Sequence, residues 1–300
     1  MKSADRSFFD RRVASPPGSE QHTAAEAFSA AVRVLRAAEY VCVLTGAGAS
    51  AESGIPTFRD RQEGIWSRYS PSELATPEAW AADPQKVWQW YSMRRAVVAA
   101  AEPNAAHHAL HDLARRVGRC TVVTQNVDDL HERAGVDNVI HLHGSIMHMR
   151  CTAGCAGRMR VPDQDAAVPY ADSAPAPSAD VHEVHPLVSI PRCFECGALM
   201  RPDVVWFGES LPERELNKAW EAALACDVFV SVGTSNLVEP AASLPWVAAT
   251  HGATVVVVNP SMEGQKEGSS ILRLRGQAGS ILPRLVDEAF AGRRVRRTAD

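Results

Sequence analysis

Short apolar runs alternate with amphipathic stretches along most of this chain. Apolar positions recur at helical spacing over 24–38, and the next apolar run begins at Val41. The same alternation returns several times. We predict strands over 41–45, 120–124, 139–142, 204–207, 228–232 and 254–259, and helices over 24–38, 105–117, 212–225, 240–251 and 280–291. Strands that alternate with helices predict an α/β fold with a doubly wound, mostly parallel sheet.

Two blocks of the chain interrupt this alternation. The first, 62–103, has a helical pattern in which Pro71, Pro77 and Pro84 mark helix starts. The second, 147–202, contains four cysteines and a stretch rich in Pro, Ala, Asp and Ser. We interpret the two blocks as insertions that together form a smaller domain.

The remaining segments form a larger domain and two tails. The larger domain consists of 24–61, 104–146 and 203–292. Residues 1–22 are polar, and we expect them to be a disordered tail. Residues 293–300 are rich in arginine, and we expect a solvated basic end there rather than a binding patch.

The bulk composition is that of an ordinary globular protein. The chain is 46% hydrophobic and 22% charged, with a net charge of −4, so we expect neither nucleic acid nor a membrane as a partner. The first 20 residues lack the apolar core of a secretory signal. We therefore expect a cytoplasmic protein, with mitochondria as the alternative in a eukaryote. In such a reducing compartment, seven cysteines indicate metal ligands or buried thiols rather than disulfides.

A glycine-rich segment follows the first predicted strand. Residues 46–59 read GAGASAESGIPTFR, in which Gly46, Gly48 and Ala51 satisfy the G-x-G-x-x-G/A spacing of a dinucleotide-binding turn. A dehydrogenase would continue into an amphipathic helix, whereas here a glycine and Pro56 end it. The acidic residue expected about 20 residues further on is also missing. The segment predicts a dinucleotide site whose chemistry is not hydride transfer.

Polar residues follow three other predicted strands. The segment 124–131 reads TQNVDDLH and lies at a strand end, where open α/β sheets place their ligands. The alternative is an ordinary helix cap formed by Asn126 or Asp128. The segment 233–235 and Asn259 follow two more strands and offer hydroxyl or amide groups to a ribose, although both positions also suit turns.

Two histidines follow the predicted strand at 139–142. His141 and His143 lie on one face because side chains alternate along a strand, and Gly144 lets the backbone approach a ligand. Histidine is the side chain best suited to accept a proton near neutral pH. A single histidine more often has a structural role, but the neighbouring motifs favour a functional one here.

The cysteines of the second insertion predict a zinc site. They form two close pairs, Cys151 and Cys155, then Cys193 and Cys196. This spacing matches a tetrahedral four-thiolate site, which is structural because it leaves no open coordination position. His182 and His185, in the long spacer, are the alternative ligands. Cys42, Cys120 and Cys226 lie in or beside apolar runs and are expected in the core.

Taken together, these motifs resemble the sirtuin family over about residues 30–290. They occur in the family's order, as 46–59, 124–131, 143–144, 204–209, 233–235 and Asn259. The resemblance implies a Rossmann-like NAD-binding domain and a smaller helical and zinc-binding domain, with NAD between them. It implies that NAD is consumed: the acyl oxygen of a modified lysine attacks the ribose carbon as nicotinamide leaves, which gives free lysine and O-acyl-ADP-ribose. It further implies a monomer whose partners are acylated-lysine proteins bound as extended peptides.

The resemblance also assigns roles to individual residues. His143 would be the general base, with Asn126 and Asp128 beside it in the catalytic group. NAD would be bound by Gly46, Ala47, Gly48, Ser50, Pro56, Phe58, Arg59, Gln125, Asn126, Asp128, Gly233, Thr234, Ser235, Asn259, Pro260, Ser261 and Ala278. The substrate peptide would pair with the 204–209 strand by β-augmentation, through Val205, Phe207, Gly208 and Glu209.

A tyrosine and an arginine in the first insertion predict which acyl group is removed. Tyr91 and Arg94 lie on one face of a predicted helix, and a phenol beside a guanidinium is a natural receptor for a carboxylate. A solvated arginine beside a half-buried tyrosine is the alternative. The pair resembles the Tyr-x-x-Arg signature of the sirtuin branch that removes succinyl, malonyl and glutaryl groups, and Ala75 matches the small residue of that branch. We predict a preference for acidic acyl-lysines with weaker deacetylase activity.

Three other functions are considered beside deacylation. A mono-ADP-ribosyltransferase of the same family would use the same site, but His143 and the pair Tyr91 and Arg94 count against it as the main role. A non-catalytic NAD-sensing module would keep the glycine-rich turn without needing a base. A zinc-containing dehydrogenase would show an absorbance change on hydride transfer.

Overall fold

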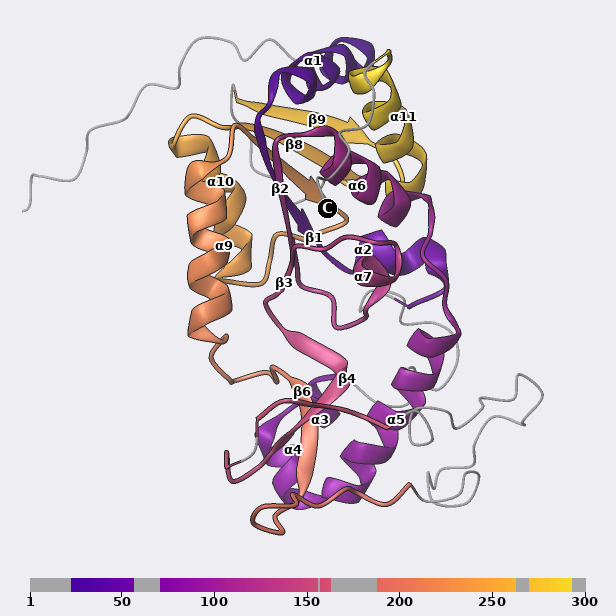
Figure 1. The fold of residues 1–300 in the computed structure, drawn as a ribbon, viewed down its shortest axis with the longest axis vertical. Helices are drawn as coiled ribbons and strands as arrows, with labels where there is room; N and C mark the ends of the chain where they lie inside the picture. The colour runs from indigo at the N-terminus through magenta and orange to yellow at the C-terminus, as the bar shows by residue number, and fades with distance from the viewer. Residues whose placement is uncertain (1–22, 57–70, 156, 163–187, 263–269, 293–300) are drawn as a thin grey trace, which may run out of the picture.

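The computed structural model describes residues 23–56, 71–155, 157–162, 188–262 and 270–292. Within them lie two sheets, and Figure 1 shows the larger one above the smaller one along the long axis of the molecule. The larger sheet has six strands in the order β3-β2-β1-β7-β8-β9. Their bounds are β1 Tyr40–Thr45, β2 Arg119–Thr124, β3 Val139–His141, β7 Val228–Val232, β8 Thr254–Asn259 and β9 Ile271–Arg275.

All neighbouring strands of this sheet are parallel, and helices cover both of its faces. One face carries α1 Ala24–Ala37, α6 Ala105–Arg116 and α11 Ala278–Phe290. The other face carries α9 Glu213–Ala225 and α10 Leu244–Thr250. The prediction of a doubly wound α/β fold is confirmed.

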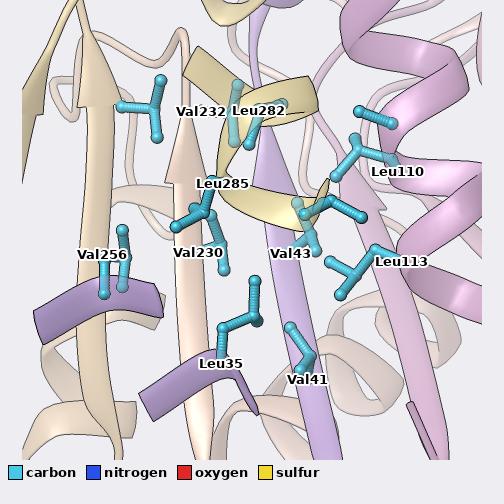
Figure 2. Packing of buried hydrophobic residues seen from close by; sticks show 14 of the residues in the cluster. Leu35, Val41, Val43, Leu110, Leu113, Val230, Val232, Val256, Leu282 and Leu285 are labelled. Carbon is cyan, nitrogen blue, oxygen red and sulfur yellow. The ribbon is translucent and has the colours of Figure 1, made fainter. Parts of the chain in front are cut away.

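The alternation of side chains along β1 shows how the strands divide between the two cores. Val41 and Val43 point to the α1 and α11 side, where Figure 2 shows them packed with Leu285 and Leu113. Their neighbours on the strand contribute to the opposite core, with α9 and α10. A strand buried on both faces reads as a continuous apolar run, which is why the sequence predicted it so clearly.

The smaller sheet is antiparallel and has the order β5-β4-β6. Its strands are β4 Gly144–Cys151, β5 Met159–Arg160 and β6 Met200–Val204. Three helices accompany it, α3 Pro71–Leu74, α4 Pro77–Ala82 and α5 Pro84–Ala100, and α5 packs on β4 and β6. The predicted helix starts at three prolines are confirmed.

One predicted strand is wrong, and other strands were missed. The strand predicted over 204–207 is β6, which ends at Val204 and lies in the smaller sheet, so the larger sheet gains its sixth strand elsewhere. That strand is β9, which was missed because its sequence ILRLR alternates apolar and basic residues at the sheet edge, without a continuous apolar run. The antiparallel sheet was missed as well, and its strand β4 begins at Gly144.

Four short elements complete the part of the chain that the structure describes. They are α2 Ala47–Ser50 and the 3-10 turn η1 Ala51–Ser53 after β1, α7 Leu130–Arg133 after β2, and η3 Ala241–Ser243 before α10. Among the described helices, none is both long and apolar enough to cross a membrane.

Candidate active site

The carboxyl ends of β1, β2, β7 and β8 lie side by side and carry most of the predicted site residues. Thr45 at the end of β1 is level with Thr124 of β2 and Val232 of β7, and Val232 is level with Val258 of β8. The loops that begin after these residues therefore meet at one edge of the sheet.

The glycine-rich turn after β1 packs directly against the loop after β7. The amide of Gly46 donates to the carbonyl of Val232, and that of Gly48 donates to the carbonyl of Gly233, both at 3.0 Å. A Cβ on Gly48 would lie 2.8 Å from the Cα of Gly233. This contact between two backbones requires glycine at position 48, which is the close backbone approach that the G-x-G spacing predicts.

Asn126 and Ser50 hold this turn in place. The Asn126 amide donates to the Gly46 carbonyl at 3.1 Å and to the Ser50 hydroxyl at 2.9 Å. The Ser50 hydroxyl donates in turn to a carboxylate oxygen of Asp128 at 3.0 Å, and all three side chains are buried. The other carboxylate oxygen of Asp128 accepts from the amide of Leu130, as the alternative prediction of a helix cap expects. The cap therefore accounts for only one of the two oxygens. The structure thus joins the segments 46–50 and 124–131 in one network.

Burial has the largest effect on the pKa of the Asp128 carboxyl group. Burial raises the pKa of Asp128, while the hydrogen bonds from Leu130 and Ser50 act in the opposite direction. A carboxylate beside the predicted nicotinamide ribose position can accept hydrogen bonds from hydroxyl or amide groups of a ligand.

His143 lies directly beyond β3, beside the same loop. Its Nδ1 is 2.9 Å from the carbonyl oxygen of Gln125, so Nδ1 carries the hydrogen and Nε2 is the nitrogen that can accept a proton. Burial lowers the pKa of His143, and the bond to Gln125 offsets part of that shift. The imidazole is therefore neutral at pH 7, as a general base must be.

His141 is held by a residue that the sequence analysis missed. Its Nε2 lies 2.6 Å from a carboxylate oxygen of Glu132 on α7, and its Nδ1 lies 3.3 Å from the carbonyl of Asn126. The two histidines thus contact the carbonyls of consecutive residues, Gln125 and Asn126. Glu132 had no recognisable signal in the sequence, because the contact joins a helix to a strand end nine residues away.

The loops after β7 and β8 are also joined. The Asn259 amide donates to the Thr234 carbonyl at 2.6 Å, and the Thr234 hydroxyl donates to the Asn236 side chain at 2.7 Å. Thr234 and Asn259 are buried, and the amide of Ser261 contacts the Asn259 side-chain oxygen at 3.4 Å. Their side chains thus order the two loops, beside which Ser235 and Pro260 are partly or fully exposed.

The remaining predicted NAD contacts lie around this edge. Ala47 is the first residue of α2, and Pro56 follows η1. Ala278 is the first residue of α11, where the amide of the next residue donates to the Glu52 carboxylate at 2.7 Å. Phe58 and Arg59 lie outside the described residues.

The predicted acyl receptor comes together in the smaller domain. Tyr91 and Arg94 lie one turn apart on α5, and the Arg94 guanidinium carbon is 4.7 Å from the centre of the Trp90 ring and 5.6 Å from that of Tyr91. Burial lowers the pKa of Arg94, while its interactions with Tyr91 and Asp128 raise it. Asp128, in the segment 124–131, is thus one of the charges that act on Arg94.

The segment 205–209 connects His143 with Ala75 of the predicted acyl site. The amide of Val205 donates to the carbonyl of His143, and that of Phe207 donates to the carbonyl of the buried Ala75, both at 2.9 Å. Gly208 follows, and the Glu209 carboxylate accepts two bonds from Arg201, at 2.5 and 2.9 Å. Glu209 is thus engaged within the protein, while pairing of this segment with a peptide stays a prediction.

The four predicted zinc ligands form one cluster. Their sulfur atoms all lie within 4.8 Å of one another, and four of the separations are between 3.1 and 3.6 Å. A tetrahedral site with Zn–S bonds of about 2.3 Å needs separations of about 3.8 Å. The four cysteines would therefore need only a small shift to bind a structural zinc. They are Cys151, Cys155, Cys193 and Cys196. His182 and His185 lie outside the described residues.

Comparison with protein families agrees with this geometry. A model of the Sir2 family matches residues 46–240. A Pseudomonas aeruginosa protein named NAD-dependent protein deacylase 1 is 48% identical over 263 residues, which cover 88% of this chain and 99% of that protein. A Methylococcus capsulatus protein named NAD-dependent protein deacylase is 50% identical over 252 residues, which cover 84% and 93%.

Solved structures share the fold. A Sir2 homolog in complex with NAD superposes with a TM-score of 0.73 at 41% identity, and the match covers 87% of this chain and 93% of that one. A Sir2 protein bound to a myristoylated histone peptide gives a TM-score of 0.65 at 31% identity, covering 88% and 97%.

Proposed function

This chain belongs to the Sir2 family of NAD-consuming enzymes, and we propose that it is an NAD-dependent protein deacylase that prefers lysines carrying acidic acyl groups. Lysines that carry succinyl, malonyl or glutaryl groups are the preferred substrates, and acetyl-lysine is a weaker substrate. One water molecule is consumed with NAD and the acyl-lysine, and the products are nicotinamide, free lysine and O-acyl-ADP-ribose.

The observation that carries this preference is the position of Arg94. It shares a face of α5 with the buried Tyr91 and lies within electrostatic reach of Asp128. Arginine and tyrosine can both donate to a carboxylate, and an arginine can do so through two parallel bonds. A succinyl group offers a carboxylate that Arg94 and Tyr91 can bind, whereas an acetyl group offers none.

Residues at the edge of the larger sheet bind NAD and transfer the proton in the proposed reaction. NAD supplies the ribose carbon that receives the acyl oxygen, and nicotinamide is its leaving group. His143 accepts a proton at Nε2 from a ribose hydroxyl, while the Gln125 carbonyl keeps its ring in the required tautomer. Asn126 and Asp128 orient the ribose end, and the turn at 46–50 binds the diphosphate.

A panel of acyl-lysine peptides tests the proposal. One peptide sequence is prepared with acetyl, malonyl, succinyl or glutaryl lysine, and products formed with NAD are identified by mass spectrometry. We expect the wild type to have a higher kcat/KM on the acidic series. Substitution Arg94→Met should lower kcat/KM on the succinyl peptide by about 10- to 100-fold, because hydrogen bonds to a charged group are lost, and should affect the acetyl peptide much less.

Two controls make the result specific. Lys86→Met removes a positive charge from the same helix, two turns away, and should leave the order of the acyl groups unchanged. His143→Ala should abolish turnover of every peptide. Equal wild-type rates on succinyl and acetyl peptides, or an unchanged succinyl rate in Arg94→Met, would contradict the proposal. Transfer of ADP-ribose to protein without deacylation would favour the transferase function instead.

A further inference from the structure

Trp206 belongs to the segment 205–209, and its side chain lies beside Tyr91 of the predicted acyl receptor. The next residue, Phe207, is 52% exposed, whereas Trp206 is only 2% exposed and packs among the residues around α5. Its indole Nε1 lies 3.0 Å from the hydroxyl oxygen of Tyr91, which is also 2% exposed. This bond is the direct link between the segment 205–209 and the predicted receptor.

The chemistry of the two groups fixes the direction of this bond. An indole N–H can only donate, whereas a phenol can donate or accept. The Tyr91 oxygen must therefore accept from Trp206, and its own hydrogen must point to another acceptor. Within the ranges that the structure describes, no protein group accepts that hydrogen. A buried hydroxyl in this state has a donor to offer to a ligand.

Several contacts hold the indole in this orientation. The guanidinium carbon of Arg201 lies 3.3 Å from the centre of the Trp206 ring. Glu209 binds Arg201 through both carboxylate oxygens and accepts from the backbone amide of Trp206 at 2.9 Å. On another side, the Trp80 ring centre is 5.7 Å from that of Trp206. The ring is thus fixed by its backbone and by both neighbours, so the N–H has little freedom to turn away.

We propose that Trp206 is a specificity-determining positioning residue, whose N–H makes Tyr91 a hydrogen-bond donor to the carboxylate of an acidic acyl group. The inference rests on the proposed function and adds to it the reason why the phenol donates. With the Trp206 bond in place, Tyr91 and Arg94 both face the acyl end as donors. Without it, the Tyr91 hydroxyl is free to rotate, and the carboxylate loses one oriented partner.

A double-mutant cycle on the full chain tests this role. Trp206→Phe keeps an aromatic ring and removes the N–H, and Tyr91→Phe removes the hydroxyl. The measured quantity is the ratio of kcat/KM on succinyl and acetyl forms of one peptide, with the KM for NAD and the melting temperature alongside. We expect Trp206→Phe to lower this ratio about tenfold, with the loss in kcat/KM concentrated on the succinyl peptide. In the Tyr91→Phe background the same change should have no further effect on the ratio.

Trp220→Phe is the matched control, because it removes an indole N–H on α9, which packs against the larger sheet rather than against Tyr91. Its ratio should equal that of the wild type. If Trp206→Phe does not fold, Trp206 can be replaced by benzothienylalanine, which keeps the bicyclic ring and lacks the N–H.

The outcomes separate the inference from the proposed function. A wild type without acidic preference contradicts the proposed function itself. A wild type with that preference, but an equal loss on both peptides in Trp206→Phe, contradicts the positioning role. The same holds if Trp220→Phe lowers the ratio as much, or if the effects of Trp206→Phe and Tyr91→Phe simply add. A selective, non-additive loss supports the role.

Discussion

The two sheets of this molecule are stabilised in different ways. The larger sheet has aliphatic cores on both faces, formed by strand valines and five helices. The smaller sheet has two minor clusters, and Cys151 and Cys193 of the thiol cluster belong to one of them. Ion pairs flank it, such as that of Arg158 with Asp203 at 3.0 Å. Stability is thus spread over many contacts in one region and concentrated in a few in the other.

This difference matches the division of labour in the proposed reaction. The larger sheet holds the loops for NAD, where the positions of backbone groups must be exact to fractions of an ångström. Tyr91, Arg94 and Trp206 lie on or beside α5, next to the smaller sheet, and in the proposal they select the acyl group. His143 lies at the junction, since its carbonyl accepts from the amide of Val205. The comparison predicts that the two regions respond separately to substitutions.

Loss of the zinc cluster should produce the largest effect. Cys193→Ala removes one of four ligands, and binding of a structural zinc is worth on the order of 10 kcal/mol. We expect zinc content to fall from one ion per chain to near zero and deacylase activity to be lost. Amide hydrogen exchange should show lost protection in β4 and β6, while β1 and β7 stay protected.

Cys120→Ala is the control for this experiment, because Cys120 lies on β2, outside the cluster. It should keep full zinc content and normal protection of β4. If β1 and β4 lose protection together in Cys193→Ala, the two regions form one cooperative unit and the comparison is wrong.

Two glycine substitutions test the close packing of the loops at the larger sheet against an uncrowded position near the thiol cluster. Gly233 and Gly197 both have φ in the left-handed region, at +61° and +73°. A Cβ on Gly233 would lie 2.5 Å from the backbone nitrogen of Ala49, whereas one on Gly197 would have no atom within 4 Å. Gly197→Ala should cost about 1–2 kcal/mol for the backbone conformation. Gly233→Ala adds the overlap and should cost roughly 2–5 kcal/mol.

Urea unfolding measures both costs, and calorimetric titration measures NAD affinity. We expect Gly233→Ala to weaken NAD binding, because it pushes the loop after β7 away from the glycine-rich turn. Gly197→Ala should leave NAD binding unchanged. Equal destabilisation by the two substitutions would show that the turn has room to adjust, contrary to the packing seen here.

The difference between the regions also explains what could be predicted from the sequence. The buried strands of the larger sheet are continuous apolar runs such as VFVSV in β7, and they were predicted within one or two residues. In the smaller sheet, β4 reads GSIMHMRC, which has no continuous run and no regular alternation. Its order comes from contacts between distant segments, which a local pattern cannot reveal.

The site shows the same limit. Glycines and strand-end polar residues predicted where the dinucleotide loops lie, because those residue types are required by close backbone approach. The bonds from Trp206 to Tyr91 and from His141 to Glu132 were not predicted. Each joins a residue with a common structural role to a site residue on another element, so only the three-dimensional arrangement identifies it.

The smallest effect is expected from the pair Glu132 and His141, which lies on the larger sheet facing the smaller domain. Burial lowers the pKa of His141, but its bond and attraction to Glu132 outweigh burial and raise it above the ordinary 6.5. For Glu132, burial raises the pKa, but the bond and attraction to His141, a backbone hydrogen bond and Arg158 together outweigh burial and lower the pKa below 4.5. The positive charge of Arg158, from the smaller domain, lowers both.

The sign of the pH dependence follows from these directions. The contribution of His141 is fully present below pH 6.5 and is lost as the pH rises through its raised folded-state pKa. The contribution of Glu132 is present above pH 4.5 and is lost as the pH falls through its lowered folded-state pKa. The pair therefore stabilises the fold most between pH 4.5 and 6.5. Because Glu132 is 42% exposed, solvent screening limits the gain to about 0.5–1 kcal/mol.

Glu132→Gln should thus lower the free energy of unfolding by about that amount at pH 6 and by less at pH 9. Glu102→Gln is the control, since it removes a carboxylate that pairs with Arg133 at 3.1 Å, in an ion pair without a histidine. Its small cost should be the same at both. Urea titrations of the three proteins at pH 6 and 9 measure this. A cost of Glu132→Gln that does not shrink at pH 9 would mean that the carboxylate acts through packing rather than through the charge of His141.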